Sequence, residues 1–139
     1  MKQNIESWAR ESGSVITRNA LPALQERTNE HLVAFRETDN RWVKVTKPGR
    51  FGYVADTDFW WDKGSQKWIS KIILREALPS EYLARLILQN DVFEDAVSLE
   101  GILITPESGL SLVSSQPDIS GNPSSLAEIC ESMKQCNFE

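Results

Sequence analysis

The sequence predicts an α+β domain with a mostly antiparallel sheet of about five strands and one packed helix, plus short N- and C-terminal helices. The first observation is the order of the patterns, which is helix, strands, helix, two strands, helix, and this order places one helix against one face of a sheet. The second is Arg41–Thr46, a β-branched run that Pro48-Gly49 ends. The third is a stripe of apolar residues at helical spacing between Pro79 and Phe93.

The chain length and charge narrow the class of protein. With 139 residues the chain is long enough for one domain, which we expect to comprise residues 1–29 (helix and lead-in), 30–117 (sheet and helix) and 118–139 (last helix). A net charge of -5 argues against nucleic-acid binding, which needs a basic surface. We expect a cytoplasmic protein that does not bind membranes, because no signal peptide or membrane-spanning run is present.

The first third of the chain reads as a helix followed by a hairpin. Residues 4–12 fit a short helix, with Asn4 as a cap and Ile5, Trp8 and Ala9 on one face. Residues 13–29 are ambiguous between short strands and turns. Residues 31–35 and 42–46 alternate as strands and are joined by turn-forming residues, which predicts a hairpin.

Residues 51–77 allow two interpretations. The turn former Asp62-Lys63-Gly64-Ser65 separates two aromatic runs, so the segment is either a second hairpin or an irregular excursion. It carries three of the five tryptophans, Trp60, Trp61 and Trp68. These three are candidate partner-binding residues, because tryptophan is enriched at interface hot spots; the alternative is that they cover the sheet as core. Asp56, Asp58 and Asp62 lack the pattern of a calcium loop and are expected to be solvated.

The second half of the chain reads as helix, two strands and helix. The predicted helix begins at Pro79, and its inward stripe comprises Tyr82, Leu83, Leu86, Ile87, Asn90 and Phe93. Strands are predicted over 97–104 and 110–114, with a turn over 105–109. The last helix, about 124–135, is expected to turn Leu126, Ile129, Cys130 and Met133 inward. Cys130 and Cys136 are expected to be free thiols, and the sequence offers no metal site.

Lys44 is the one residue of the central strand that is a candidate for chemistry. It lies between Val43 and Val45, which share the opposite face of the strand. Either it binds an anion, or it is a structural lysine that pairs with a carboxylate or extends to solvent. His31 is the only histidine, and no nucleophile motif accompanies it, so we expect a hydrogen-bonded strand residue.

Several blocks of the sequence, taken in order, carry a resemblance. They are Trp8-Ala9, Glu30-His31-x-Val33, Lys44-Val45-Thr46-Lys47-Pro48-Gly49-x-Phe51-Gly52, Glu81-Tyr82-Leu83-x-Arg85-Leu86, Leu99-Glu100-Gly101 and Ser115-Gln116-Pro117. In this order and spacing the chain resembles the N-lobe part of a kinase-like domain found in polyvalent proteins of phages and conjugative elements. The resemblance covers nearly the whole chain.

The resemblance implies a nucleotide site and also departs from one. It implies that Lys44 pairs with nucleotide phosphates, that Glu81 meets Lys44, and that residues 114–117, including Gln116, form a hinge beside an adenine. The chain lacks a glycine-rich loop before Lys44 and a catalytic or metal-binding aspartate motif after Pro117. Trp42, two residues before Lys44 on the same face, is also expected to crowd an adenine pocket.

These observations predict a non-catalytic protein that binds another protein and needs no cofactor. The family setting implies a phage or mobile-element origin, and from that context we expect an inhibitor of host defence, of anti-CRISPR type. One alternative is the nucleotide-binding part of a phosphotransferase, which uses ATP with magnesium and whose catalytic lobe lies elsewhere. Another is a structural homodimer, since a lobe without its second lobe exposes apolar surface.

Overall fold

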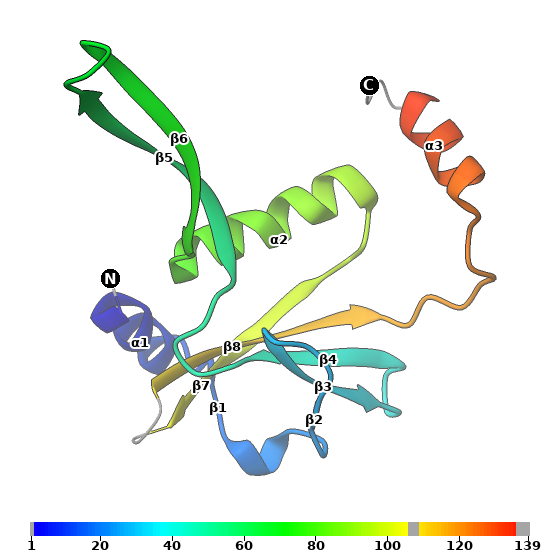
Figure 1. The fold of residues 1–139 in the computed structure, drawn as a ribbon. Coiled ribbons are helices and arrows are strands. Elements are labelled where there is room, and N and C mark those ends of the chain that lie inside the picture. Colours follow the sequence, from blue (N-terminus) through cyan, green and yellow to red (C-terminus); the bar gives the residue numbers. More distant parts are fainter. Residues whose placement is uncertain (1, 106–108, 136–139) are drawn as a thin grey trace.

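The computed structural model describes residues 2–105 and 109–135, and it shows an α+β fold with two sheets (Figure 1). The elements, in chain order, are α1 (Lys2–Glu11), β1 (Val15–Ile16), a 3₁₀ turn η1 (Arg18–Ala20), β2 (Gln25–Glu26), β3 (His31–Arg36), β4 (Arg41–Thr46), β5 (Tyr53–Asp62), β6 (Lys67–Glu76), α2 (Pro79–Phe93), β7 (Ser98–Thr105), β8 (Gly109–Pro117) and α3 (Leu126–Gln135). Cys136, which was predicted to be a free thiol, and residues 106–108 of the predicted 105–109 turn lie outside the described residues.

The main sheet has six strands in the order β1-β7-β8-β4-β3-β2. All neighbouring strands are antiparallel except β1 and β7, which are parallel. The prediction of a mostly antiparallel sheet is therefore confirmed. It has six strands rather than about five, namely the four predicted strands β3, β4, β7 and β8, and the two-residue strands β1 and β2 that the ambiguous lead-in supplies at the two edges. The predicted β3–β4 hairpin is also present.

The core lies on both faces of this sheet. On one face, α1 and α2 cover a cluster that includes Phe51, Tyr82, Ile102 and Leu112. On the other face, Ile16, Leu21 and Leu24 of the lead-in and Leu32 of β3 pack on a second cluster, which comprises Val43, Val45, Leu103 and Val113. The alternation predicted for β4 is confirmed, because Val43 and Val45 share the second cluster and Lys44 turns toward α2.

The ambiguity over residues 51–77 is resolved by β5 and β6, which form a separate two-stranded hairpin. Its ten-residue strands pair from Tyr53↔Glu76 to Asp62↔Lys67, and the predicted turn joins them. Asp62 stabilises the turn by accepting hydrogen bonds from the backbone N–H and the hydroxyl of Ser65. Figure 1 shows the hairpin projecting away from the main sheet beyond α2.

Two predicted inward surfaces are wrong. The predicted inward residues of α3 (Leu126, Ile129, Cys130 and Met133) are all exposed, since the polar link after β8 carries α3 away from the sheet (Figure 1). On α2, Tyr82 is buried and Leu83 and Leu86 pack on the core, but Ile87 and Phe93 are more than 60% exposed. The sheet covers only the first turns of α2, so the apolar stripe of the helix extends beyond the part that contacts the sheet.

Within the described residues, no helix is both long enough and apolar enough to cross a membrane.

Candidate functional site

Two features outside the main core can carry function. One is a polar cavity between α2 and the sheet, lined by Glu30, His31, Lys44, Tyr82, Arg85, Leu86, Gln89, Val97, Ser114 and Gln116, which we call the Lys44 cavity. The other is the β5–β6 hairpin.

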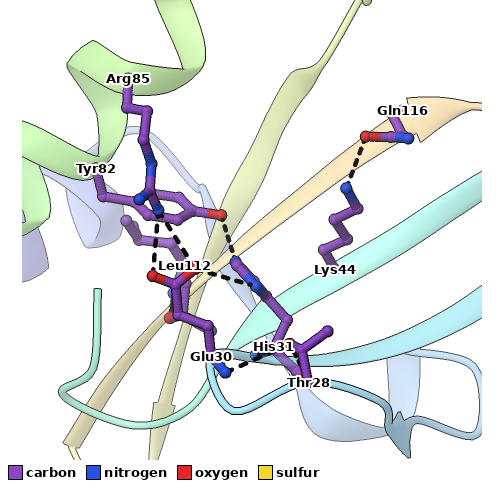
Figure 2. A network of polar contacts seen from close by, with 9 residues as sticks. Thr28, Glu30, His31, Lys44, Tyr82, Arg85, Leu112 and Gln116 are labelled. Carbon is purple, nitrogen blue, oxygen red and sulfur yellow. Dashed lines mark hydrogen bonds and ion pairs between the residues drawn. The ribbon is translucent and has the colours of Figure 1, made fainter. Parts of the chain in front are cut away.

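Lys44 reaches the cavity because it lies mid-strand in β4, opposite Ser114 of β8. Its Nζ atom donates a hydrogen bond of 2.7 Å to Oε1 of Gln116 (Figure 2). Within the described part of the chain, no carboxylate lies within ion-pair distance of Nζ. Burial lowers the pKa of Lys44, and the more distant Asp95 carboxylate partly opposes this shift. The cavity measures about 310 Å³ and so has room for a small ligand beside the ammonium group.

A hydrogen-bonded chain from β3 to α2 forms the adjoining wall (Figure 2). The imidazole Nε2 of His31 lies 2.9 Å from the Tyr82 hydroxyl, and Thr28 Oγ1 accepts a hydrogen bond of 2.9 Å from the His31 backbone N–H. The Glu30 carboxylate lies 3.6 Å from His31 Nδ1 and 3.3 Å from the Arg85 guanidinium. This series of hydrogen bonds and ion pairs therefore ties α2 to the start of β3 and holds Arg85 at the cavity.

Gly52 permits this arrangement. It has φ +83°, and a Cβ atom added there would lie 1.7 Å from Oε1 of Glu30. A side chain at this position would therefore displace the Glu30 carboxylate from Arg85 and would also strain the backbone.

The pKa of His31 is lowered, chiefly by burial; Glu30 opposes this shift, whereas Lys44 and Arg85 add to it. Because the folded state disfavours the charged imidazole, the unfolded state binds more protons below pH 6.5, and stability is lost as the pH falls below that value.

We expect NMR titration of this single histidine to give a pKa below 6.5. We also expect a His31→Gln variant to lose less stability than the wild type between pH 7 and pH 5. A midpoint at or above 6.5 would contradict this account.

Glu81 does not meet Lys44, so that prediction is wrong. Its carboxylate is 2.5 Å from Nη2 of Arg75, and it accepts a further hydrogen bond of 2.7 Å from the Leu78 backbone N–H. Arg75 also contacts Asp56 at 2.7 Å. The Arg75 guanidinium, followed by the Leu78 N–H, lowers the pKa of Glu81 to about 2. Glu81 thus anchors the base of the hairpin to the start of α2 through Arg75.

Trp42 lies beside the predicted hinge, because residues 114–117 of β8 pair with residues 41–44 of β4. Trp42 is opposite Gln116, its indole N–H donates to Asp118 at 2.7 Å, and its ring packs on Phe35. The structure therefore brings Lys44 and Gln116 together, and pairs Trp42 with the same glutamine in the strand register.

The strand register divides the hairpin into two chemically different faces. Directly paired residues of β5 and β6 share a face, and successive residues alternate between the faces. The apolar hairpin face comprises Tyr53, Ala55, Thr57, Phe59, Trp61, Trp68, Ser70, Ile72, Leu74 and Glu76. The charged hairpin face comprises Val54, Asp56, Asp58, Trp60, Asp62, Lys67, Ile69, Lys71, Ile73 and Arg75.

The apolar hairpin face is exposed to solvent, although all but one of its residues are uncharged. The exception is Glu76, at its base. The exposed fractions of its large side chains are 64% for Tyr53, 63% for Phe59, 48% for Trp61, 69% for Trp68, 74% for Ile72 and 73% for Leu74. A run of exposed apolar side chains on this scale is unusual on a monomer. An isolated two-stranded hairpin is also marginally stable in water, so this face is expected to be covered.

The charged hairpin face is solvated along most of its length and is held toward α2 at its base. Asp58 pairs opposite Lys71 and Asp62 opposite Lys67 across the strands, and such opposite charges stabilise a solvated face. At the base, the Asp56–Arg75–Glu81 contacts and the packing of Val54 on the core turn this face toward α2. The apolar hairpin face therefore points away from the body.

The three candidate tryptophans are all exposed but do not form one patch. Trp61 and Trp68 share the apolar hairpin face and meet edge to face at 5.8 Å between ring centroids. Trp60 pairs with Ile69 on the charged hairpin face. The alternation of apolar and acidic residues along β5 indicates which face each tryptophan lies on, since the turn fixes the register.

Two of the three aspartates that were predicted to be solvated have protein partners of their own. Asp56 binds Arg75 and Asp62 binds Ser65. Among the residues that the structure describes, no group of three or more histidine, cysteine or acidic side chains is placed to hold a metal ion.

Comparison with family models, with curated proteins and with solved structures gives no match to this chain.

Proposed function

We propose that this chain is a non-catalytic protein-binding module whose interaction element is the apolar hairpin face. The observation that carries the proposal is the register of β5 and β6. It gathers six large, exposed apolar side chains on one face, and from the Ala55↔Leu74 pair to the Trp61↔Trp68 pair that face holds no charged residue. Tryptophan and tyrosine are enriched among the few residues that supply most of the binding energy at protein interfaces.

The setting of this function rests on the resemblance to the kinase-like domain of polyvalent proteins. In that setting we propose that the chain serves a phage or mobile element, and that protein binding blocks a host defence component.

The adjacent isoleucines of β6 allow a matched test of the interaction element. Ile72 lies on the apolar hairpin face and Ile73 on the charged hairpin face, so Ile72→Lys and Ile73→Lys introduce the same charge on opposite sides. We expect tagged Ile72→Lys protein to lose at least tenfold in capture of binding proteins from host cells, whereas Ile73→Lys captures as the wild type does. Equal capture by the Ile72→Lys variant and the wild type would overturn the proposal.

A second candidate function, binding of a phosphate-bearing ligand, is favoured by the Lys44 cavity. Lys44 and Arg85 both line it, against the single Glu30 carboxylate, so it has an excess of positive charge. The phosphates of ATP fit these groups. A magnesium ion has no matching cluster among the described residues, and Glu81 is held by Arg75.

Thermal unfolding with ATP tests this second candidate. A ligand at a hundredfold excess over its Kd, bound to the folded state alone, stabilises it by about 2.7 kcal/mol. We expect a rise in Tm of several degrees that persists when EDTA removes magnesium, that Lys44→Ala abolishes, and that the control Lys71→Ala retains. The absence of any rise with ATP would rule this function out.

A further inference from the structure

We infer that the protein covering the apolar hairpin face is a second copy of the same chain, packed face to face with its hairpin running in the opposite direction. This inference rests on the proposed function, because it names the protein that covers the proposed interaction element while no other partner is bound. The order of side chains along the two strands supports it.

The first step is the symmetry. Two sheets that pack face to face can be related by a two-fold axis that lies between them and perpendicular to the strands. Such an axis places β5 over β5 and β6 over β6, with the base of one hairpin over the tip of the other. The two bodies then lie at opposite ends and do not collide, since each body sits at the base of its hairpin (Figure 1).

The second step is the fit of side chains. With the axis at the Thr57↔Ile72 pair, residue 59 faces residue 55 of the second copy, and residue 70 faces residue 74. Two of the contacts then join a large side chain to a small one, since Phe59 meets Ala55 and Leu74 meets Ser70. At the axis itself, Thr57 and Ile72 each face the same residue of the second copy. Alternation of large and small residues across facing positions is the arrangement that lets two layers interdigitate.

The third step concerns the two ends of the face. Trp61 and Trp68 at the tip lie over Tyr53 and Glu76 at the base of the second copy. Glu76 is the one charged residue of the apolar hairpin face, and the indole N–H groups are donors that can face its carboxylate. The arrangement therefore gives the single charge on this face a hydrogen-bonding partner.

The area is sufficient for a dimer. If each of the six exposed side chains contributes about 100 Å², two facing copies bury roughly 1,200 Å², which is at the lower end of the range for specific interfaces. We therefore expect a reversible dimer at micromolar concentrations.

A size swap at positions 55 and 59 tests this geometry. Light scattering at micromolar concentrations should show a dimer for the wild type. Ala55→Phe and Phe59→Ala should each raise the dimer Kd at least tenfold, because one crowds the contact and the other leaves it empty. The Ala55→Phe/Phe59→Ala double variant should restore the wild-type Kd, and this recovery also shows that the substitutions leave the hairpin folded.

The outcomes separate the dimer from the proposed function. A wild-type monomer at all concentrations, or a double variant as weak as the worse single variant, overturns the dimer geometry. Either result leaves the proposed function in place if Ile72→Lys alone abolishes protein capture. If capture is unaffected by Ile72→Lys, the proposed function fails as well.

Discussion

Replacing Tyr82 by alanine is expected to destabilise the fold by about 3–5 kcal/mol, the cost of removing a large buried aromatic side chain. Tyr82 is 2% exposed in the first turns of α2 and meets Phe51 edge to face at 6.5 Å between ring centroids. The Arg85 guanidinium lies over the Tyr82 ring, 5.2 Å from its centroid. The Tyr82 hydroxyl is hydrogen-bonded to the His31 imidazole. Tyr82 therefore joins α2 both to the loop before β5 and to the start of β3.

Tyr82→Phe is the matched control for this prediction. It keeps the ring and removes the hydroxyl, so its expected cost is about 1 kcal/mol, the net value of one hydrogen bond. Urea unfolding followed by circular dichroism measures both variants. A loss below about 1.5 kcal/mol for Tyr82→Ala would mean that α2 does not dock through this residue.

Replacing Gly101 by alanine is expected to cost about 2–4 kcal/mol, the sum of overpacking and backbone strain. Gly101 lies at an irregularity in β7, next to the parallel strand β1. A Cβ atom there would lie 2.2 Å from the backbone carbonyl oxygen of Ser14, which accepts a hydrogen bond from the Ile102 N–H. Since backbone atoms form the obstacle, the lead-in would have to move off the sheet edge and uncover the second core cluster.

Gly121→Ala is the control for Gly101, because nothing lies within 4 Å of its added Cβ. Its unfolding free energy should change by less than about 0.5 kcal/mol. Hydrogen exchange should also show faster exchange of β1 amides in the Gly101→Ala protein. Wild-type stability of the Gly101→Ala variant would contradict the close β1–β7 contact described here.

Those parts of the fold that depend on local pattern could be predicted from the sequence. The predicted helix from Pro79 to Phe93 matches α2, because a proline at its first position and helical spacing define it locally. The Arg41–Thr46 strand is defined equally well by its alternation and its Pro48-Gly49 end. The parallel β1–β7 pair was not predicted, since two residues, Val15 and Ile16, carry almost no pattern of their own.

The site was harder to predict, because it depends on which side chains the tertiary fold brings together. Glu81 was assigned to Lys44 by resemblance, but the hairpin places Arg75 beside it. The exposure of α3 also depends on where the polar link directs the chain. The division of the hairpin into two faces, by contrast, was available from the sequence, because Asp56 and Asp58 alternate with Thr57 and Phe59 once the turn at Asp62 is recognised.

The most direct test of the central claim is site-specific photo-cross-linking from the hairpin in expressing cells. A photoreactive benzophenone residue at position 72 lies on the apolar hairpin face, and one at position 73 lies on the charged hairpin face. The account predicts a discrete protein adduct from position 72 and little or none from position 73, and the adduct should have twice the mass of the chain if the occupant is a second copy. Equal adducts from both positions, or none from position 72, would contradict it.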